Sequence, residues 1–108
     1  NPDDYSAYIR KGLAFIRTNE ESYRLVVNAS DLNLFANKLK NIFSKRLIPM
    51  STSHGFSSDI DKRTVQAYFV VSACVDTIVQ YLKGNLCSSI DTVGDVIVEA
   101  IDKLSGKV

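Results

Sequence analysis

The chain has 108 residues, a length typical of a single domain that buries a hydrophobic core without disulfides or metals. Hydrophobic residues make up 45% and charged residues 23%, with 5 Gly and 2 Pro, which excludes collagen-like, low-complexity and disordered classes. Thirteen basic and twelve acidic residues give a formal net charge of +1 without a long basic cluster, so we expect no nucleic-acid binding by this chain itself.

Five helices are predicted in chain order, spanning about residues 1–18, 18–28, 31–49, 58–83 and 88–106. In each segment, apolar residues recur at three- and four-residue steps, which places them on one helix face. No strand pattern and no internal repeat interrupts the series. The sequence therefore predicts an all-α, five-helix bundle in one domain, 1–108.

Local signals set the ends of the first three helices. Asn1 and Pro2 suit the cap and first turn of the first helix. Thr18, followed three residues later by Glu21, has the form of a capping box and opens the second. Pro49 disfavours helix at the residue before it and closes the third. The second helix would direct three side chains inward: Tyr23, Val26 and Val27.

Small polar residues mark the connections around the last two helices. Residues 50–58 have the composition of a loop and are the best linker candidate. Ser58 would start the fourth helix, and Gly84 would stop it in a left-handed conformation. Ser88 or Ser89 would cap the fifth helix, which we expect to end at Gly106.

The fourth predicted helix is apolar around most of its circumference. Such a helix must be covered on most sides. One interpretation is a homodimer in which the last two helices of two chains form a four-helix contact; the other is a monomer with this helix at the centre of its core. The homodimer interpretation assigns eight residues to the interface: Val71, Val75, Ile78, Val79, Leu82, Val93, Ile97 and Ile101.

Nothing in the sequence predicts a membrane segment. The most apolar run, residues 67–75, is far shorter than the roughly 20 residues that cross a bilayer. The opening residues, 1–4, lack the basic and apolar regions of a signal peptide. Cys74 and Cys87 lack the paired spacings of a disulfide scaffold. We therefore expect a cytoplasmic protein that makes no membrane contact.

Two stretches resemble the C-terminal domain of TetR-type bacterial transcriptional regulators. The first contains Tyr8-Ile9-Arg10 and Phe15-Ile16-Arg17, then Asn19-Glu20-Glu21-Ser22-Tyr23-Arg24-Leu25-Val26. The second runs from Tyr68 to Leu82, followed by Ser88-Ser89 and a closing amphipathic helix. It departs from the family at two places: Ser72, Ala73 and Cys74 stand where the family often has Gly or Ala, and Tyr81 stands where Trp is common.

This resemblance implies a regulatory function. The last two helices would form the dimer interface, and the first, third and fourth would enclose a pocket for a small-molecule effector of unknown identity. DNA binding would belong to an N-terminal helix-turn-helix head that is absent from this chain. The alternative is a free-standing helical adaptor. Because Met50 is the only methionine, we expect the chain to be processed or a piece of a longer protein.

The candidate pocket residues combine aromatic side chains with one polar stripe. Aromatic walls with few polar groups are typical of small-molecule sites, although aromatic residues at helical spacing also form plain cores. Tyr68, Ser72 and Asp76 recur at four-residue steps; Asp76 would face a polar or cationic ligand, or the stripe is a solvated or dimer-spanning seam. The ligand-binding candidates are Tyr8, Phe15, Phe35, Leu39, Tyr68, Phe69, Ser72 and Asp76.

No pattern in the sequence predicts an enzyme. His54 is the only histidine and lies in a serine-rich segment, so metal-ligand spacing and a rigid general base are both missing. Cys74 is expected in the core and Cys87 at the surface. Gly-rich phosphate loops and nucleophile elbows are absent. We expect no cofactor, no metal and no catalytic residue.

Overall fold

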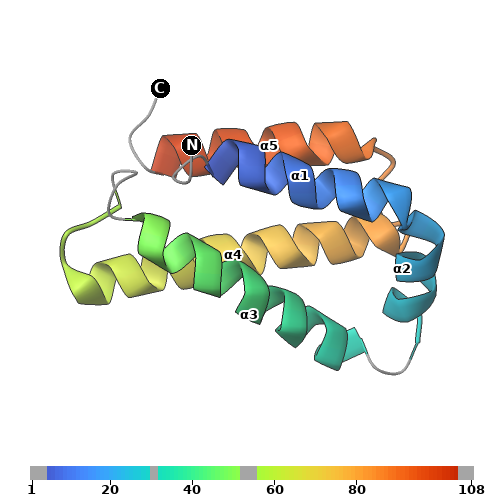
Figure 1. The fold of residues 1–108 in the computed structure, drawn as a ribbon, viewed down its shortest axis with the longest axis horizontal. Helices are drawn as coiled ribbons and strands as arrows, with labels where there is room; N and C mark the ends of the chain where they lie inside the picture. Colours follow the sequence, from blue (N-terminus) through green and yellow to red (C-terminus); the bar gives the residue numbers. More distant parts are fainter. Residues whose placement is uncertain (1–4, 30–31, 52–55, 105–108) are drawn as a thin grey trace.

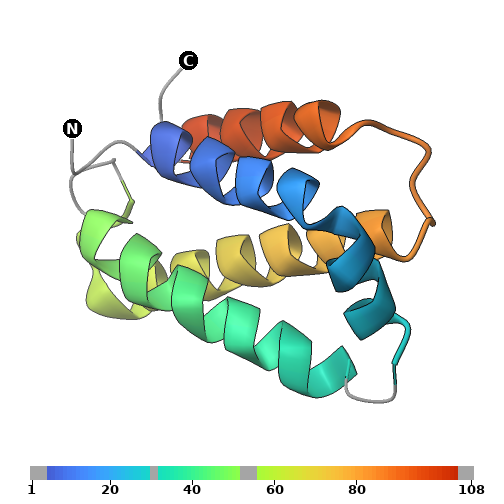
Figure 2. The ribbon, with the colours of Figure 1, turned by 45° about the vertical axis from the view of Figure 1, so that its right-hand side comes forward.

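The computed structural model describes residues 5–29, 32–51 and 56–104. These residues form five helices and no strand: α1 (Tyr5–Thr18), α2 (Glu20–Val27), α3 (Leu32–Ser51), α4 (Ile60–Leu82) and α5 (Ile90–Leu104). The all-α prediction and the order of the helices are confirmed. Figures 1 and 2 show two layers, with α1 beside α5 in one and α3 beside α4 in the other, while α2 crosses between the layers at one end.

The central element is α4, which contacts α2, α3 and α5. Toward α3, it presents Val71, Val75 and Val79, which pack against Phe35, Ala36, Leu39 and Phe43. Toward the other layer, Ile78 and Leu82 join a core that includes Ile9, Leu13 and Ile16 of α1. Burial on both of these sides explains why the helix is apolar around most of its circumference.

This arrangement corrects the residues that the sequence assigned to a dimer interface. All eight are between 0 and 5% exposed within a single chain. Three of the chain's own helices already cover α4, so these side chains are not accessible to a partner. The exposed large apolar residues of α4 and α5 are different ones: Ile60, Val65, Tyr68, Phe69, Val96 and Leu104.

By length and composition alone, α4 is long and apolar enough to cross a membrane. The run 67–75 considered in the sequence is too short, but the complete helix has 23 residues. A core helix of a soluble protein meets the same criterion. Because α4 is packed by three helices and eight of its residues are buried, its position here is that of a core helix.

Two of the predicted helix starts are wrong in detail. The Thr18 hydroxyl donates to the Ala14 carbonyl (3.0 Å), and the Asn19 side-chain amide donates to the Phe15 carbonyl (2.9 Å). No side chain caps α2, because the predicted cap Thr18 and the residue at the N-cap position, Asn19, both bond back to α1 instead. At α4, the cap is Asp59 and not Ser58, because Asp59 Oδ1 accepts from the backbone N–H groups of Asp61 and Lys62.

The remaining boundaries show which local signals were decisive. Ser89 accepts from the Thr92 backbone N–H (3.2 Å), and Gly84 has a φ of 85°, both as predicted. By contrast, α3 continues past Pro49 to Ser51, so this proline lies in the last turn and does not end the helix before it. The expected cap at Asn1 and Pro2, residues 52–55 of the linker and the end at Gly106 lie outside the described residues.

Two side chains depart from the predicted burial. Val26 is 38% exposed, because the eight-residue α2 packs with one narrow face and buries Val27 instead. Phe56, in the predicted linker, is 5% exposed and belongs to the main core. The chain before α4 is therefore anchored to the bundle at this residue.

Candidate ligand-binding cavity

A cavity of about 240 Å³ lies between the two layers and is lined by residues of all five helices. On α4, the lining residues Val70, Cys74 and Ile78 are four residues apart and so share one face. On α5, Ile97 and Ile101 have the same spacing. The cavity thus follows the apolar stripes of these helices at a place where the two layers do not close completely.

The wall of the cavity is almost entirely apolar. The hydroxyls of Tyr8 and Tyr23 and the thiol of Cys74 are the polar side-chain groups among its lining residues, and none of these residues is Asp, Glu, Lys, Arg or His. Such a wall suits an apolar group and gives a buried charge no partner.

The cavity opens between α1 and α3. These helices do not pack closely along their length within the described residues, whereas α1 packs along α5 and α3 along α4. Two lining residues mark the mouth, since Phe15 of α1 is 59% exposed and Ile42 of α3 is 56% exposed.

Aromatic contacts bound the mouth at both ends. At one end, the rings of Tyr8 and Phe43 meet edge to face, with centroids 6.2 Å apart. At the other, Tyr23 of α2 contacts Phe15 (6.2 Å) and Phe35 (5.9 Å), and so bridges α1 to α3. Aromatic pairs in such edge-to-face and tilted arrangements stabilise the two ends of the mouth.

The structure brings together four of the eight predicted pocket residues. Tyr8, Phe15, Phe35 and Leu39 line the cavity. The other four, all on α4, do not: Tyr68 and Phe69 are 69% and 67% exposed, Asp76 is exposed, and Ser72 is half-buried outside the lining. The register of α4 explains the difference, because Phe69 and Val70 point about 100° apart and Val70 takes the cavity side.

The polar stripe of α4 is therefore not part of this cavity. Asp76 accepts a long hydrogen bond from the Gln80 amide (3.4 Å) at the surface, as a solvated seam would. The Ser72 hydroxyl is buried without a hydrogen-bond partner among the described residues. The expectation that Asp76 faces a cationic ligand has no support in this geometry.

Sequence reasoning missed Gly12 as a pocket residue. It lies in the middle of the apolar face of α1 and lines the cavity, and a Cβ built on it meets no atom within 4 Å. A glycine at a buried-face position of a helix was the available signal, since glycine there lowers helix stability and leaves space.

Cys74 lies in the cavity wall, and burial raises the pKa of its thiol to about 11. The thiol is therefore protonated near neutral pH, and the protonated form is not the nucleophile. Cys74 is half-buried and Cys87 exposed, and both are free. The described residues contain no group of three His, Cys, Asp or Glu side chains that could hold a metal ion; His54 lies outside them.

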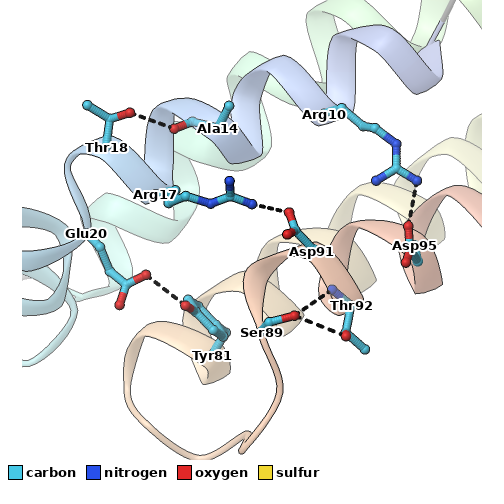
Figure 3. Close-up of polar contacts among 10 residues, drawn as sticks. All are labelled: Arg10, Ala14, Arg17, Thr18, Glu20, Tyr81, Ser89, Asp91, Thr92 and Asp95. Atoms are coloured by element: carbon cyan, nitrogen blue, oxygen red, sulfur yellow. Dashed lines mark hydrogen bonds and ion pairs between the residues drawn. The ribbon is translucent and has the colours of Figure 1, made fainter.

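A polar network joins α2 to the C-terminal end of α4. The Tyr81 hydroxyl donates to Glu20 (2.7 Å), and Arg24 pairs with the same carboxylate (2.9 Å), as Figure 3 shows for the first contact. Arg24 also donates to the Leu82 carbonyl (2.7 Å) at the C-terminal end of α4 and lies over the Tyr81 ring (5.2 Å). Hydrogen bonds from Tyr81 and Arg24 lower the pKa of Glu20, whereas burial and the bond to Glu20 raise the pKa of Tyr81.

A second polar seam joins α1 to α5. Arg10 pairs with Asp95 (2.7 Å), and Arg17 pairs with Asp91, both at the surface (Figure 3). Between them, the side chain of Leu13 packs against Gly94, where a Cβ would lie only 2.8 Å from it. This flank of α1 is closed, in contrast to the open flank facing α3.

A family model described as a transcriptional regulator C-terminal region, of the TetR type, matches residues 3–103. The match spans all five helices except Leu104, the last residue of α5, and includes every residue that lines the cavity. No curated protein and no solved structure shows a significant match.

Proposed function

Because the chain belongs to the TetR family of transcriptional regulators as their C-terminal region, we propose that it binds a small-molecule effector in the cavity between its two helical layers. The observation that carries this proposal is the cavity itself, with apolar walls, a mouth between α1 and α3 and aromatic pairs at both ends of that mouth. No catalytic step, metal or cofactor is part of the proposal.

The proposed output is control of DNA binding in a longer cytoplasmic parent protein. An N-terminal helix-turn-helix head of roughly 50 to 70 residues would read DNA, and the effector would favour one arrangement of two heads over another. Such coupling between two sites is typically about 1 to 3 kcal/mol. A shift of this size would change operator affinity by about 5- to 150-fold.

Filling the cavity tests effector binding. Gly12→Leu places a side chain in the open space at the cavity wall, whereas Ala14→Leu places the same side chain on the exposed face of α1. Compounds that bind the folded state raise its melting temperature. We expect compounds that stabilise the unsubstituted chain and Ala14→Leu in a thermal-shift screen to have no effect on Gly12→Leu. Equal stabilisation of both variants would remove the cavity from the proposal.

We propose a homodimer as the assembly, formed through exposed apolar residues of α4 and α5. These helices are antiparallel neighbours (Figure 1), so Leu104 at the end of α5 lies toward the start of α4, where Val65 and Phe69 are about two-thirds exposed. Large apolar side chains gathered on one surface are typical of a protein interface. The buried residues first assigned to the interface would stay in the core of each chain.

Light scattering tests the dimer. Phe69→Glu would place a charge in the proposed interface, and we expect it to give a monomer at tens of micromolar while the unsubstituted chain is a dimer. Leu25→Glu is the matched control, because Leu25 is 76% exposed on α2, away from α4 and α5 in the proposed contact. A monomeric unsubstituted chain, or a Phe69→Glu dimer, would contradict the assembly.

A further inference from the structure

We infer that the effector is an amphipathic anion, with an apolar body in the cavity and an anionic group at the mouth. This inference rests on the proposed function and adds the chemical class of the ligand. It comes from the charges on the two helices that form the mouth, which differ from those on the rest of the described chain.

Neither helix at the mouth contains an acidic residue. The α1 sequence carries three basic residues and α3 carries four, and neither helix contains Asp or Glu. The acidic residues of the described chain belong to α2, α4 with its cap, and α5. The mouth is therefore formed by two helices of one charge sign.

Helical register places three of these cations beside the mouth. Lys11 precedes the exposed lining residue Phe15 by four positions, so the two are neighbours on the surface of α1. On α3, the exposed lining residue Ile42 has Lys38 four positions before it and Lys45 three positions after it. All three lysines are exposed.

These lysines differ from the arginines of α1. Arg10 and Arg17 pair with carboxylates of α5 on the closed flank. The ion pairs found between described residues involve none of the three lysines. Their charge at the mouth is thus not neutralised by a carboxylate of the described residues, and an anionic group on a bound molecule would interact favourably with it.

The cavity itself sets the apolar part of the ligand. A methylene group is about the size of a water molecule, which occupies about 30 Å³. The cavity volume of about 240 Å³ therefore accommodates roughly eight such groups. No lining side chain offers a charge partner, so a charged group is stable at the mouth and not inside. A monocarboxylate with a chain of about this length combines both requirements.

Three probes with one apolar body test this class: octanoate, octan-1-ol and octylammonium. Titration calorimetry with the full 108-residue chain gives their dissociation constants. We expect octanoate to bind roughly fivefold more tightly than octan-1-ol, and octylammonium more weakly than both. Raising the salt concentration to about 0.5 M should reduce the advantage of octanoate, because the lysines are exposed.

Substitution of the mouth lysines identifies the source of the preference. In Lys11→Gln/Lys38→Gln/Lys45→Gln, we expect octanoate and octan-1-ol to bind equally, while Lys103→Gln keeps the preference. Lys103 is the control because it lies about 200° around α5 from the lining residue Ile101. Circular dichroism verifies the fold of each variant, and Lys38→Gln alone, expected to reduce the preference in part, replaces the triple variant if that variant unfolds.

The outcomes separate this inference from the proposed function. If octan-1-ol binds as tightly as octanoate, or octylammonium binds most tightly, the anion preference is wrong although the cavity still binds a ligand. An octanoate preference that survives substitution of the lysines overturns their role at the mouth. If none of the three probes binds the folded chain, the inference is wrong, and the cavity-filling screen decides the proposed function separately.

Discussion

The two flanks of α1 are built in different ways. On the α5 side, the side chain of Leu13 packs against Gly94, and two surface ion pairs lie along the seam. On the α3 side, aromatic contacts such as Tyr8 with Phe43 bridge the ends of a cavity mouth. The α5 flank is close-packed because Gly94 has no side chain. The α3 flank is bridged by large aromatic side chains that leave space between them.

This difference indicates where the bundle is rigid and where it adapts. Close-packed helices tolerate little change in volume, whereas a cavity lined by flexible edges accepts an added group. We therefore expect substitutions on the α5 flank to change the free energy of unfolding, and substitutions on the α3 flank to change ligand affinity more than stability.

The largest expected effect comes from adding one side chain to each flank. Gly94→Leu should lower the free energy of unfolding by about 2 to 3 kcal/mol, because its side chain would collide with Leu13 and Arg10 in the packed seam. Gly12→Leu adds the same atoms on the cavity side and should change stability by less than about 1 kcal/mol, helped by the loss of a helical glycine. Urea unfolding followed by circular dichroism measures both. Equal destabilisation by the two substitutions would contradict the contrast between the flanks.

A smaller effect is expected at Arg24, which connects α2 to the C-terminal end of α4. Arg24→Met removes the hydrogen bonds to Glu20 and to the Leu82 carbonyl, and should lower the free energy of unfolding by about 1 to 2 kcal/mol. Lys83→Met, at the C-cap of α4, is the control for loss of a positive charge near that helix end. If both substitutions cost the same in urea unfolding, the helix-end charge would explain the effect and the specific bonds would not.

The sequence predicted the five helices because their stripes and stops are local. Gly84 and Ser89 act through the backbone of the next few residues, and both predictions are confirmed. Thr18 failed as a cap because its hydroxyl had a second local option, the carbonyl of Ala14. Periodicity therefore located the elements more reliably than it located their first residues.

The lining of the cavity was predicted only in part, for a related reason. Periodicity shows that Phe69 and Val70 lie on different sides of α4, but the neighbours of each side are set by helices distant in sequence. The same limit applies to Arg24, whose partners at Tyr81 and Leu82 are 57 and 58 residues away. The match of residues 3–103 to a regulator C-terminal region confirms the resemblance carried by such stretches, without assigning a ligand or an interface.

Acid should weaken the contact that Glu20 of α2 makes with Tyr81 of α4. The bonds from Tyr81 and Arg24 lower the pKa of Glu20 below its usual 4.5, so the folded state favours the ionised carboxylate. Its contribution to stability is complete above the unfolded-state pKa and is lost as pH falls through the lower folded-state pKa. Urea midpoints measured between about pH 6 and pH 3 should therefore fall less in Glu20→Gln than in the unsubstituted chain. Parallel pH curves for the two proteins would show that this carboxylate adds no pH-dependent stability.

The smallest expected effect separates packing from charge on the α5 flank. The side chains of Arg10 and Arg17 are about half exposed, and those of their partners Asp95 and Asp91 are more exposed. Exposed ion pairs contribute about 0.2 to 1 kcal/mol each. Arg10→Gln/Arg17→Gln should therefore lower the free energy of unfolding by less than Gly94→Leu does, and the difference from the unsubstituted chain should diminish in about 1 M salt. A loss as large as that of Gly94→Leu, persisting in salt, would mean that the ion pairs and not the close approach at Gly94 hold the flank. The expected result would mean that helix packing, and not the ion pairs, makes this flank rigid. A molecule bound on the opposite side of α1 could then be accommodated without disturbing that packing.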